Sequence, residues 1–205
     1  MKKNSSIHSI ILIWFGWAVI LLAFQHWIDA RLDLKYPDYA LSWTAGETTP
    51  DSQAGKPSLL DPFMNTQVAW DSEYYLSIAT MGYDDPAVEG IASDFAWGGY
   101  TQKFCSPRPG TDCVSRNYAF FPLYPWLTWV VALPLQLLPL TVIARATLAA
   151  VIVSLLGTLG AMLSLYFMSR ESLGEEGGIR VAFYFLIFPS GFFLAQVYTE
   201  GIFLG

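Results

Sequence analysis

Charged residues are scarce in this chain, and basic residues are the scarcer kind. Only 14% of the 205 residues are charged, with 11 Lys and Arg against 17 Asp and Glu. Nucleic-acid binding needs a basic surface, so a net charge of −6 argues against a nucleic-acid partner. With 54% hydrophobic and 16% aromatic residues, the chain is also too apolar for an ordinary soluble domain. The composition indicates an all-α polytopic membrane protein.

Cysteine is nearly absent, since Cys105 and Cys113 are the only two in the chain. No histidine lies near them in the sequence, so they do not make a convincing metal site. The turn signal Pro109-Gly110 lies between them, so the chain can fold back and bring the two thiols together. In an oxidising compartment we expect a structural disulfide between them.

The first long apolar run covers residues 7–27 and is long enough to cross the ~30 Å hydrocarbon core. Lys2 and Lys3 precede it, which places the N-terminus in the cytoplasm and the following loop outside. A cleavable signal peptide is the alternative interpretation. The run is longer than a usual signal h-region, and no clear small-x-small cleavage site follows it, so we expect a transmembrane anchor.

Two further spanning helices are expected at residues 142–168 and 181–197, with residues 198–205 starting a next segment. The polar turn between them, residues 169–180, begins and ends near arginines, which favours the cytoplasmic side. The chain ends within an apolar run, so we expect it to be the N-terminal portion of a longer protein. All of it belongs to one membrane domain.

Residues 120–140 are apolar but contain four prolines and two tryptophans of the kind that prefer the membrane interface. The segment either crosses the membrane or lies in its surface as an interfacial or re-entrant piece. The second arrangement is favoured, and it places Asp71 and Glu200 on the same side of the membrane.

The loop from residue 28 to residue 119 holds 13 acidic residues against six Lys or Arg. Residues 44–56 are rich in Thr, Gly, Pro and Ser and are expected to be irregular. Residues 61–81 carry apolar side chains at helical spacing, and Gly82 is a candidate C-terminal stop. We expect an amphipathic helix here that lies on the membrane and carries Asp71 and Glu73.

Three blocks rich in aromatic residues lie in a fixed order along the chain: Trp70–Ala79 with Gly82-Tyr83, Asn117–Pro125, and Phe188–Ser190 with Tyr198–Glu200. In this order they resemble the PIG-V-type (GPI mannosyltransferase II-like) mannosyltransferases, which belong to the GT-C class of multi-spanning glycosyltransferases. The blocks cover most of the chain from Trp70 onward. The loop before Trp70 and the cysteine-bearing stretch have no counterpart in that family.

The resemblance implies GT-C-like transmembrane helices with a large extracytoplasmic first loop. It also implies inverting transfer of mannose from polyprenyl-phosphate mannose to a hydroxyl acceptor on that face, as in GPI-anchor-like biosynthesis. The acceptor is a glycan, a glycolipid or a protein, and membrane lipids are further partners. Alternatives are a GT-C enzyme for another polyprenyl-phosphate-linked sugar, or a non-catalytic scaffold or transporter. A transporter would place its ionisable groups near the membrane midplane, whereas here they cluster in a loop.

The chemistry of such a transfer requires a base, because a sugar hydroxyl attacks only as its proton is removed. The transition state resembles an oxocarbenium ion, and the leaving phosphate needs cations or amide donors around it. Asp71 is the candidate catalytic base, with a capping or surface carboxylate as its alternative role. Candidates for substrate binding are Glu200, Glu73, Asp84, Asp85, Arg116 and Tyr198.

Each of these candidates has a structural alternative. Asp84-Asp85 follows the Gly82-Tyr83 turn and precedes Pro86, so it is either a cation or acceptor site or a plain turn. Arg145 could reach headgroups or the donor phosphate from the external end of its helix. No cofactor is certain, and a divalent cation is a candidate. The sequence lacks an obvious eukaryotic targeting signal, which favours a bacterial plasma membrane.

Overall fold

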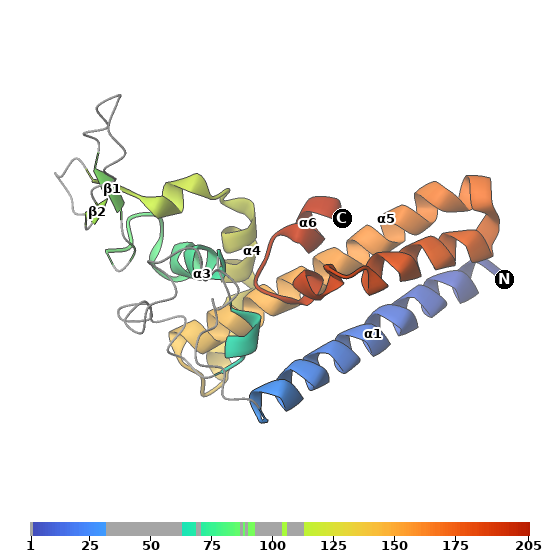
Figure 1. The fold of residues 1–205 in the computed structure, drawn as a ribbon, viewed down its shortest axis with the longest axis horizontal. Coiled ribbons are helices and arrows are strands. Elements are labelled where there is room, and N and C mark those ends of the chain that lie inside the picture. The colour runs from blue at the N-terminus through green and yellow to red at the C-terminus, as the bar shows by residue number, and fades with distance from the viewer. Residues whose placement is uncertain are drawn as a thin grey trace. The chain divides into compact units, whose positions relative to one another are not determined.

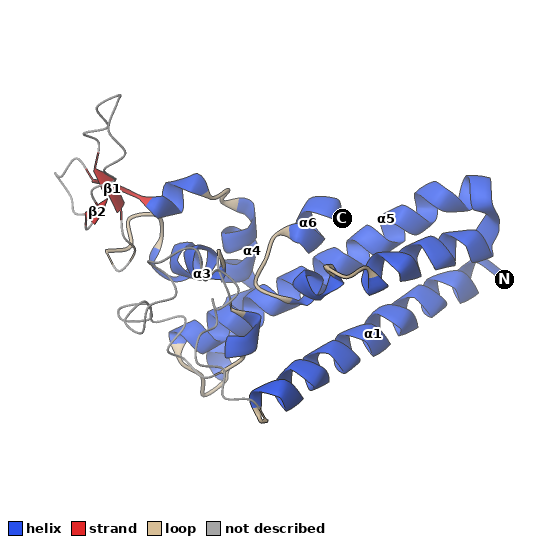
Figure 2. Cartoon of the chain, in the orientation of Figure 1, coloured by secondary structure: helices blue, strands red, loops and turns tan. Residues whose placement is uncertain are grey.

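The computed structural model describes residues 2–31, 63–68, 71–86, 88, 90–92, 104–105 and 113–205. Helices dominate these residues, and three short strands accompany them (Figure 2). The chain forms two compact units, one combining residues 1–34 with 150–205 and the other covering residues 35–149. Trp70 and the stretch expected to be irregular, residues 44–56, lie outside the described residues.

Helix α1, Lys2–Asp29, is apolar around most of its circumference. Leu12 and Ile20 are each 71% exposed, whereas Ile10 is fully buried. The 24-residue stretch Ser5–Ile28 has a mean hydropathy of 2.3 over its most apolar 18 residues. At ~1.5 Å per residue it extends for about 36 Å, which exceeds the ~30 Å hydrocarbon core. The helix is therefore long and apolar enough to cross a membrane, and it includes the whole of the expected segment 7–27.

Helix α5, Val142–Ile187, consists of two arms joined at Gly174, whose φ of 74° and ψ of 174° are not helical. Its most apolar part has a mean hydropathy of 2.2, so it too could cross a membrane. The expectation of a polar turn over residues 169–180 was wrong. The first arm continues past residue 168 to Gly174, and helix resumes directly after it, because one glycine is enough to reverse the chain.

The backbone at Gly174 gives a first prediction. A Cβ at this position would contact nothing within 4 Å, but it would be held at a φ that side chains rarely adopt. We expect Gly174→Ala to lower the free energy of unfolding by ~1–3 kcal/mol through backbone strain alone. Thermal unfolding of the wild type and the variant in detergent measures this change in stability.

Gly16 in α1 is the matched control, since a Cβ there also has nothing within 4 Å and its φ is not positive. Gly16→Ala should be neutral or stabilising by up to about 1 kcal/mol, because alanine favours the helix. Equal effects of the two substitutions would show that Gly174 does not define the turn.

Helix α1 packs against the arms of α5 (Figure 1). Trp14 Nε1 donates a hydrogen bond of 2.9 Å to Leu155 O. The two arms approach closely, since a Cβ on Gly178 would lie 2.8 Å from Tyr166 Cδ2. The buried cluster that joins these helices comprises Ile10, Met162, Tyr166, Ala182, Leu186 and Leu194. This cluster is the apolar core of the first unit.

The chain after α5 does not follow the expected helix 181–197. The helix ends at Ile187, immediately before Phe188-Pro189, because a residue that precedes proline is driven away from helical geometry. A 3-10 helix, η5, follows at Gly191–Ala195, and α6 covers Glu200–Leu204. A Cβ on Gly201 would lie 2.6 Å from Ser154 O, so only glycine permits α6 to approach α5 this closely.

The described part of the second unit begins with a 3-10 helix, η2 at Asn65–Gln67, and helix α3 at Ser72–Met81. The expected helix over 61–81 was wrong in its first half, since Met64 has a φ of 54° that a right-handed helix does not permit. Gly82 ends α3, as predicted, with a φ of 86° and its N–H bonded to Ile78 O.

A small antiparallel sheet follows α3 and was not predicted. It has the order β2-β1-β3, with β1 at Gly90–Ala92, β2 at Phe104–Cys105 and β3 at Cys113–Ser115. Ala92 pairs with Cys113, and Gly90 pairs with both Cys105 and Ser115. The sheet therefore brings the two cysteine-bearing strands to opposite edges of β1.

The apolar segment 120–140 forms two short helices instead of one long one. After η3, Arg116–Ala119, come α4 at Leu123–Ala132 and η4 at Pro134–Leu137. The ten residues of α4 extend only about 15 Å, roughly half of the hydrocarbon core. Its Tyr124 and Thr128 are buried, whereas Trp126 is 57% exposed. The helix thus has a packed side and an exposed apolar side.

Candidate functional site

Asp71 lies at the N-terminal end of α3, and its side chain is exposed. Its backbone carbonyl accepts hydrogen bonds from the N–H groups of Tyr74 at 3.1 Å and Tyr75 at 3.4 Å. Its carboxylate makes no capping hydrogen bond to the first turn. Capping, which is the common structural role of aspartate at this position, is therefore not the role of this carboxylate.

The electrostatic surroundings of Asp71 suit a proton acceptor. Burial of the carboxyl group by neighbouring protein raises its pKa, although part of the side chain reaches solvent. A raised pKa makes the carboxylate a better base than a fully hydrated aspartate. The group combines solvent access with increased basicity.

Aromatic rings fix the first turn of α3 against the segment that follows η3. Tyr74 stacks on Phe120 with 4.8 Å between ring centroids and 16° between the ring planes. Tyr75 contacts Phe120 and Tyr124 edge-on, each at 5.1 Å. Arg116 Nη1 donates to the Tyr74 hydroxyl at 3.2 Å. Two of the three sequence blocks thus meet at the turn that follows Asp71.

A buried polar network fixes the other end of α3. Ser77 Oγ donates to Asp85 Oδ2 at 2.7 Å, and Asn117 Nδ2 donates to Ser77 Oγ at 2.9 Å. Asn117 Nδ2 also lies 3.3 Å from the Gly82 carbonyl oxygen. Asn117 is completely buried and Asp85 is 7% exposed. These contacts connect α3, the turn after it and η3 into one body.

Asp84 and Asp85, both candidates for substrate binding, make structural contacts. Tyr118 donates a hydrogen bond of 3.0 Å to Asp84 Oδ1, and this bond, together with the negative charge of Asp84, raises the pKa of the Tyr118 hydroxyl. Tyr83 donates to Phe120 O at 2.9 Å, so the turn itself is anchored. The turn interpretation of Asp84-Asp85 fits these bonds better than an open cation site.

The remaining candidates, Glu73, Glu200 and Tyr198, belong to different units. Glu73 is half-buried in the first turn of α3, beside Asp71 in sequence. Glu200 is half-buried at the start of α6, in the first unit. Tyr198 is buried there, its carbonyl accepts a bond from Ser154 Oγ at 3.0 Å, and its ring meets Phe193 at 5.2 Å. These contacts explain the burial of Tyr198 without a substrate.

Cys113 is disulfide-bonded, and Cys105 is the only other cysteine of the chain. A Cβ on Gly90 would lie 2.5 Å from Cys113 Sγ, so the strand between the cysteines needs a glycine there. In the part of the chain that the structure describes, no group of three His, Cys, Asp or Glu side chains could hold a metal ion.

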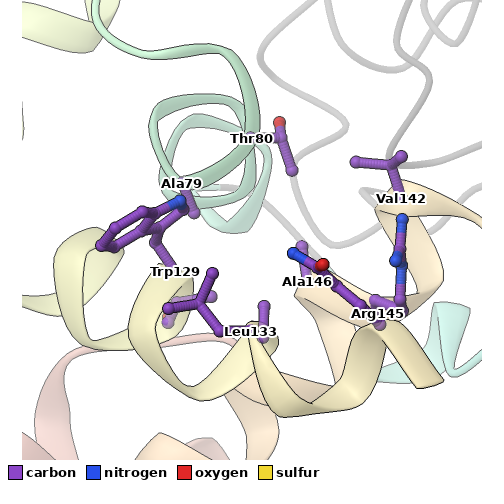
Figure 3. Close-up of a pocket in the computed structure, with 10 residues that line it drawn as sticks. Ala79, Thr80, Trp129, Leu133, Val142, Arg145 and Ala146 are labelled. Atoms are coloured by element: carbon purple, nitrogen blue, oxygen red, sulfur yellow. The ribbon is translucent and has the colours of Figure 1, made fainter. Parts of the chain in front are cut away.

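A cavity of about 160 Å³ lies within the second unit (Figure 3). Residues from α3, α4, η4 and the start of α5 line it: Ala79, Thr80, Thr128, Trp129, Ala132, Leu133, Gln136, Val142, Arg145 and Ala146. Arg145 was expected from the sequence to reach headgroups or a phosphate, but nothing was predicted for Thr128. The only available signal for Thr128 was a polar residue on the otherwise apolar α4.

Comparisons with models of protein families, with curated proteins and with solved structures find no match to this chain.

Proposed function

We propose that this protein is a membrane glycosyltransferase that moves mannose from polyprenyl-phosphate mannose to a hydroxyl acceptor, with Asp71 as the general base. The observation that carries the proposal is the state of that carboxylate: exposed, uncapped, raised in pKa, and held at the start of a helix fixed by aromatic packing. The first of the sequence blocks that resemble PIG-V-type enzymes contains this residue, and the second packs on the helical turn that follows it.

The proposed topology is multi-pass. α1 and the first arm of α5 cross the membrane, the second arm of α5 crosses it together with the segment that follows, and the N-terminus lies in the cytoplasm of a bacterium. α4 and η4 then lie in the outer interface, a placement supported by the short length of α4 and its exposed Trp126 and Leu123. A donor phosphate resides at headgroup level, so a base on a helix packed against α4 would be at the right depth.

In the proposed reaction the acceptor hydroxyl attacks the anomeric carbon of mannose. Its proton passes to a carboxylate oxygen of Asp71, the new C–O bond forms, and the bond from carbon to the phosphate oxygen breaks. Polyprenyl phosphate leaves with the bonding electrons, and the anomeric configuration inverts. The negative charge of Asp71 also favours the oxocarbenium-like transition state electrostatically.

Membranes containing the full-length protein, supplied with a panel of labelled polyprenyl-phosphate sugars, test the proposal. We expect label to leave the mannose donor and to appear on a glycan, glycolipid or protein. Transfer from another sugar donor instead would retain the enzyme class and change the substrate. No transfer from any of these donors would contradict the proposal and favour a scaffold or transporter.

The raised pKa of Asp71 predicts the pH dependence of the reaction. The base acts only when ionised, so activity must fall as the pH drops through its pKa. Since burial raises that pKa, the acid limb of the kcat/KM profile should lie above the range of a hydrated aspartate. A profile that stays flat down to the ordinary aspartate range would assign the base to another group.

A further inference from the structure

The disulfide of the second unit joins the two edge strands of the small sheet across its central strand. Cys105 of β2 lies opposite Gly90 of β1. Cys113 of β3 lies opposite Ala92 of the same central strand. Strands that flank a central strand lie ~10 Å apart in a flat sheet, whereas a disulfide joins Cα atoms that are only about 4.4–6.8 Å apart. The bond therefore holds β2 and β3 closer together than the backbone pairing alone requires.

The bond lies over one face of β1 and is open to small molecules. A Cβ on Gly90 would lie 2.5 Å from Cys113 Sγ, so the sulfur packs directly on the central strand. Cys113 is half-buried, and its neighbour Val114 is 52% exposed. A small dithiol in solution can therefore reach the bond, which makes it a group capable of thiol–disulfide exchange as well as a structural restraint.

Strand β3 leads directly into the residues that hold α3. Ser115 ends this strand, is 3% exposed, and starts η3 by accepting a hydrogen bond of 3.3 Å from Asn117 N through its Oγ. Arg116 of η3 donates to the Tyr74 hydroxyl in the first turn of α3. Asn117 donates to Ser77 Oγ in the second half of that helix. A displacement of β3 is therefore passed to both halves of α3.

Backbone pairing alone restrains β3 only weakly. β1 and β3 have three residues each and β2 has two, so few hydrogen bonds between strands hold the sheet together. A sheet this small is marginal in water without further support. The disulfide closes the chain between residues 105 and 113, which restricts the unfolded form of this segment and so favours the paired strands. Loss of the bond should release β3 and, with it, η3.

We propose that the Cys105–Cys113 disulfide is a redox switch that keeps α3, and with it Asp71, in place for transfer. Reduction by a dithiol delivers two electrons and two protons: the S–S bond breaks, two thiols form, and the dithiol becomes a disulfide. Without the bond, β3 and η3 loosen their hold on α3. The effect on transfer rests on the proposed function, whereas the coupling between the disulfide and α3 does not.

The surroundings of Asp71 provide a test that a general loss of folded protein would not mimic. Neighbouring protein buries part of its carboxyl group and raises its pKa. A loosened α3 should expose this group to water, and its pKa should then fall towards that of a hydrated aspartate. Since the base acts only when ionised, the acid limb of the kcat/KM profile should move to lower pH after reduction. Unfolding of part of the sample would instead lower the rate equally at every pH.

Hydrogen exchange of the full-length protein in nanodiscs tests the coupling without any substrate. The wild type is measured oxidised, after reduction with dithiothreitol, and after re-oxidation with oxidised glutathione. We expect the amides of α3 to exchange about 10–100-fold faster after reduction, because the bond no longer disfavours the open form. Residues 150–170 of α5, which belong to the other unit, should exchange at an unchanged rate, and re-oxidation should restore the protection of α3.

A variant that lacks both thiols, Cys105→Ala/Cys113→Ala, is the matched control. Its α3 amides should exchange as they do in the reduced wild type, and dithiothreitol should not change them further. Mannosyl transfer is measured on the same preparations. It should fall at least tenfold when the wild type is reduced, because a small displacement of a catalytic group has effects of this size, and it should recover on re-oxidation.

Three results would overturn the switch: unchanged exchange of α3 after reduction, an equal acceleration in α5, or a transfer rate that does not respond to reduction. If reduction loosens α3 but the oxidised protein transfers no sugar, the coupling stands and the proposed reaction fails. Hydrogen exchange and transfer thus test the two conclusions separately.

Discussion

Asp71→Asn should lower the rate of mannosyl transfer by about 10²–10⁴-fold, the usual contribution of a positioned general base. Asparagine keeps the shape of the side chain but cannot accept the proton of the attacking hydroxyl. The carboxylate makes no capping bond in the first turn of α3, so the substitution should leave the fold and the protein level unchanged. Initial rates in membranes at equal protein level measure the effect.

Glu73→Gln is the matched control, because it removes a carboxylate from the same helical turn. Residues two apart do not face each other on a helix, so Glu73 cannot replace Asp71 at one substrate atom. We expect its effect on the rate to stay within about tenfold, well short of the loss in Asp71→Asn. If transfer survives in Asp71→Asn, the base lies elsewhere, and Glu200→Gln is the next variant to measure.

Asn117→Ala should produce the largest loss of stability in the second unit. The substitution removes the amide that donates to Ser77 Oγ and to Gly82 O, and it leaves a cavity at a fully buried position. Each lost hydrogen bond contributes ~1 kcal/mol, and the cavity adds to this loss. We therefore expect the free energy of unfolding to fall by ~2–4 kcal/mol. Hydrogen exchange of the α3 amides measures this loss of stability locally. The exchange rate should rise by the factor that corresponds to the lost free energy.

Tyr118→Phe is the control for this second variant. It removes the exposed hydrogen bond to Asp84 and should change the stability by less than about 1 kcal/mol. Since α3 carries Asp71 at its start, the loosened helix in Asn117→Ala should also transfer mannose more slowly. Unchanged protection of the α3 amides would show that the buried network does not hold the helix in place.

The parts of the fold that could be predicted depend on local signals. The apolar run of α1 and the glycine that ends α3 are both readable from neighbouring residues, and both expectations agree with the structure. The boundaries of α5 were not predicted correctly, and the residues responsible are again close in the sequence. Gly174 reverses the chain within one residue, so the polar residues around it remain helical, and Pro189 ends the second arm early.

The candidate site was only partly predictable, because its contacts join residues far apart in the sequence. Asp71 was identified from its motif, but its place at the very start of a helix was not predicted, because the helix was expected to begin near residue 61. Asn117 lies 40 residues from Ser77, and no periodicity indicates that pairing. The unsatisfied hydroxyl of Thr128 becomes visible only when α3, α4 and α5 pack together.

The measurement that tests the central claim most directly uses the full-length protein in liposomes and a donor labelled in both the mannose and the polyprenyl phosphate. We expect one polyprenyl phosphate to be released for each mannosylated product of inverted configuration, and neither to form with Asp71→Asn. Equal product formation by the variant, or phosphate release that is not coupled to product, would contradict a transfer reaction that depends on this carboxylate.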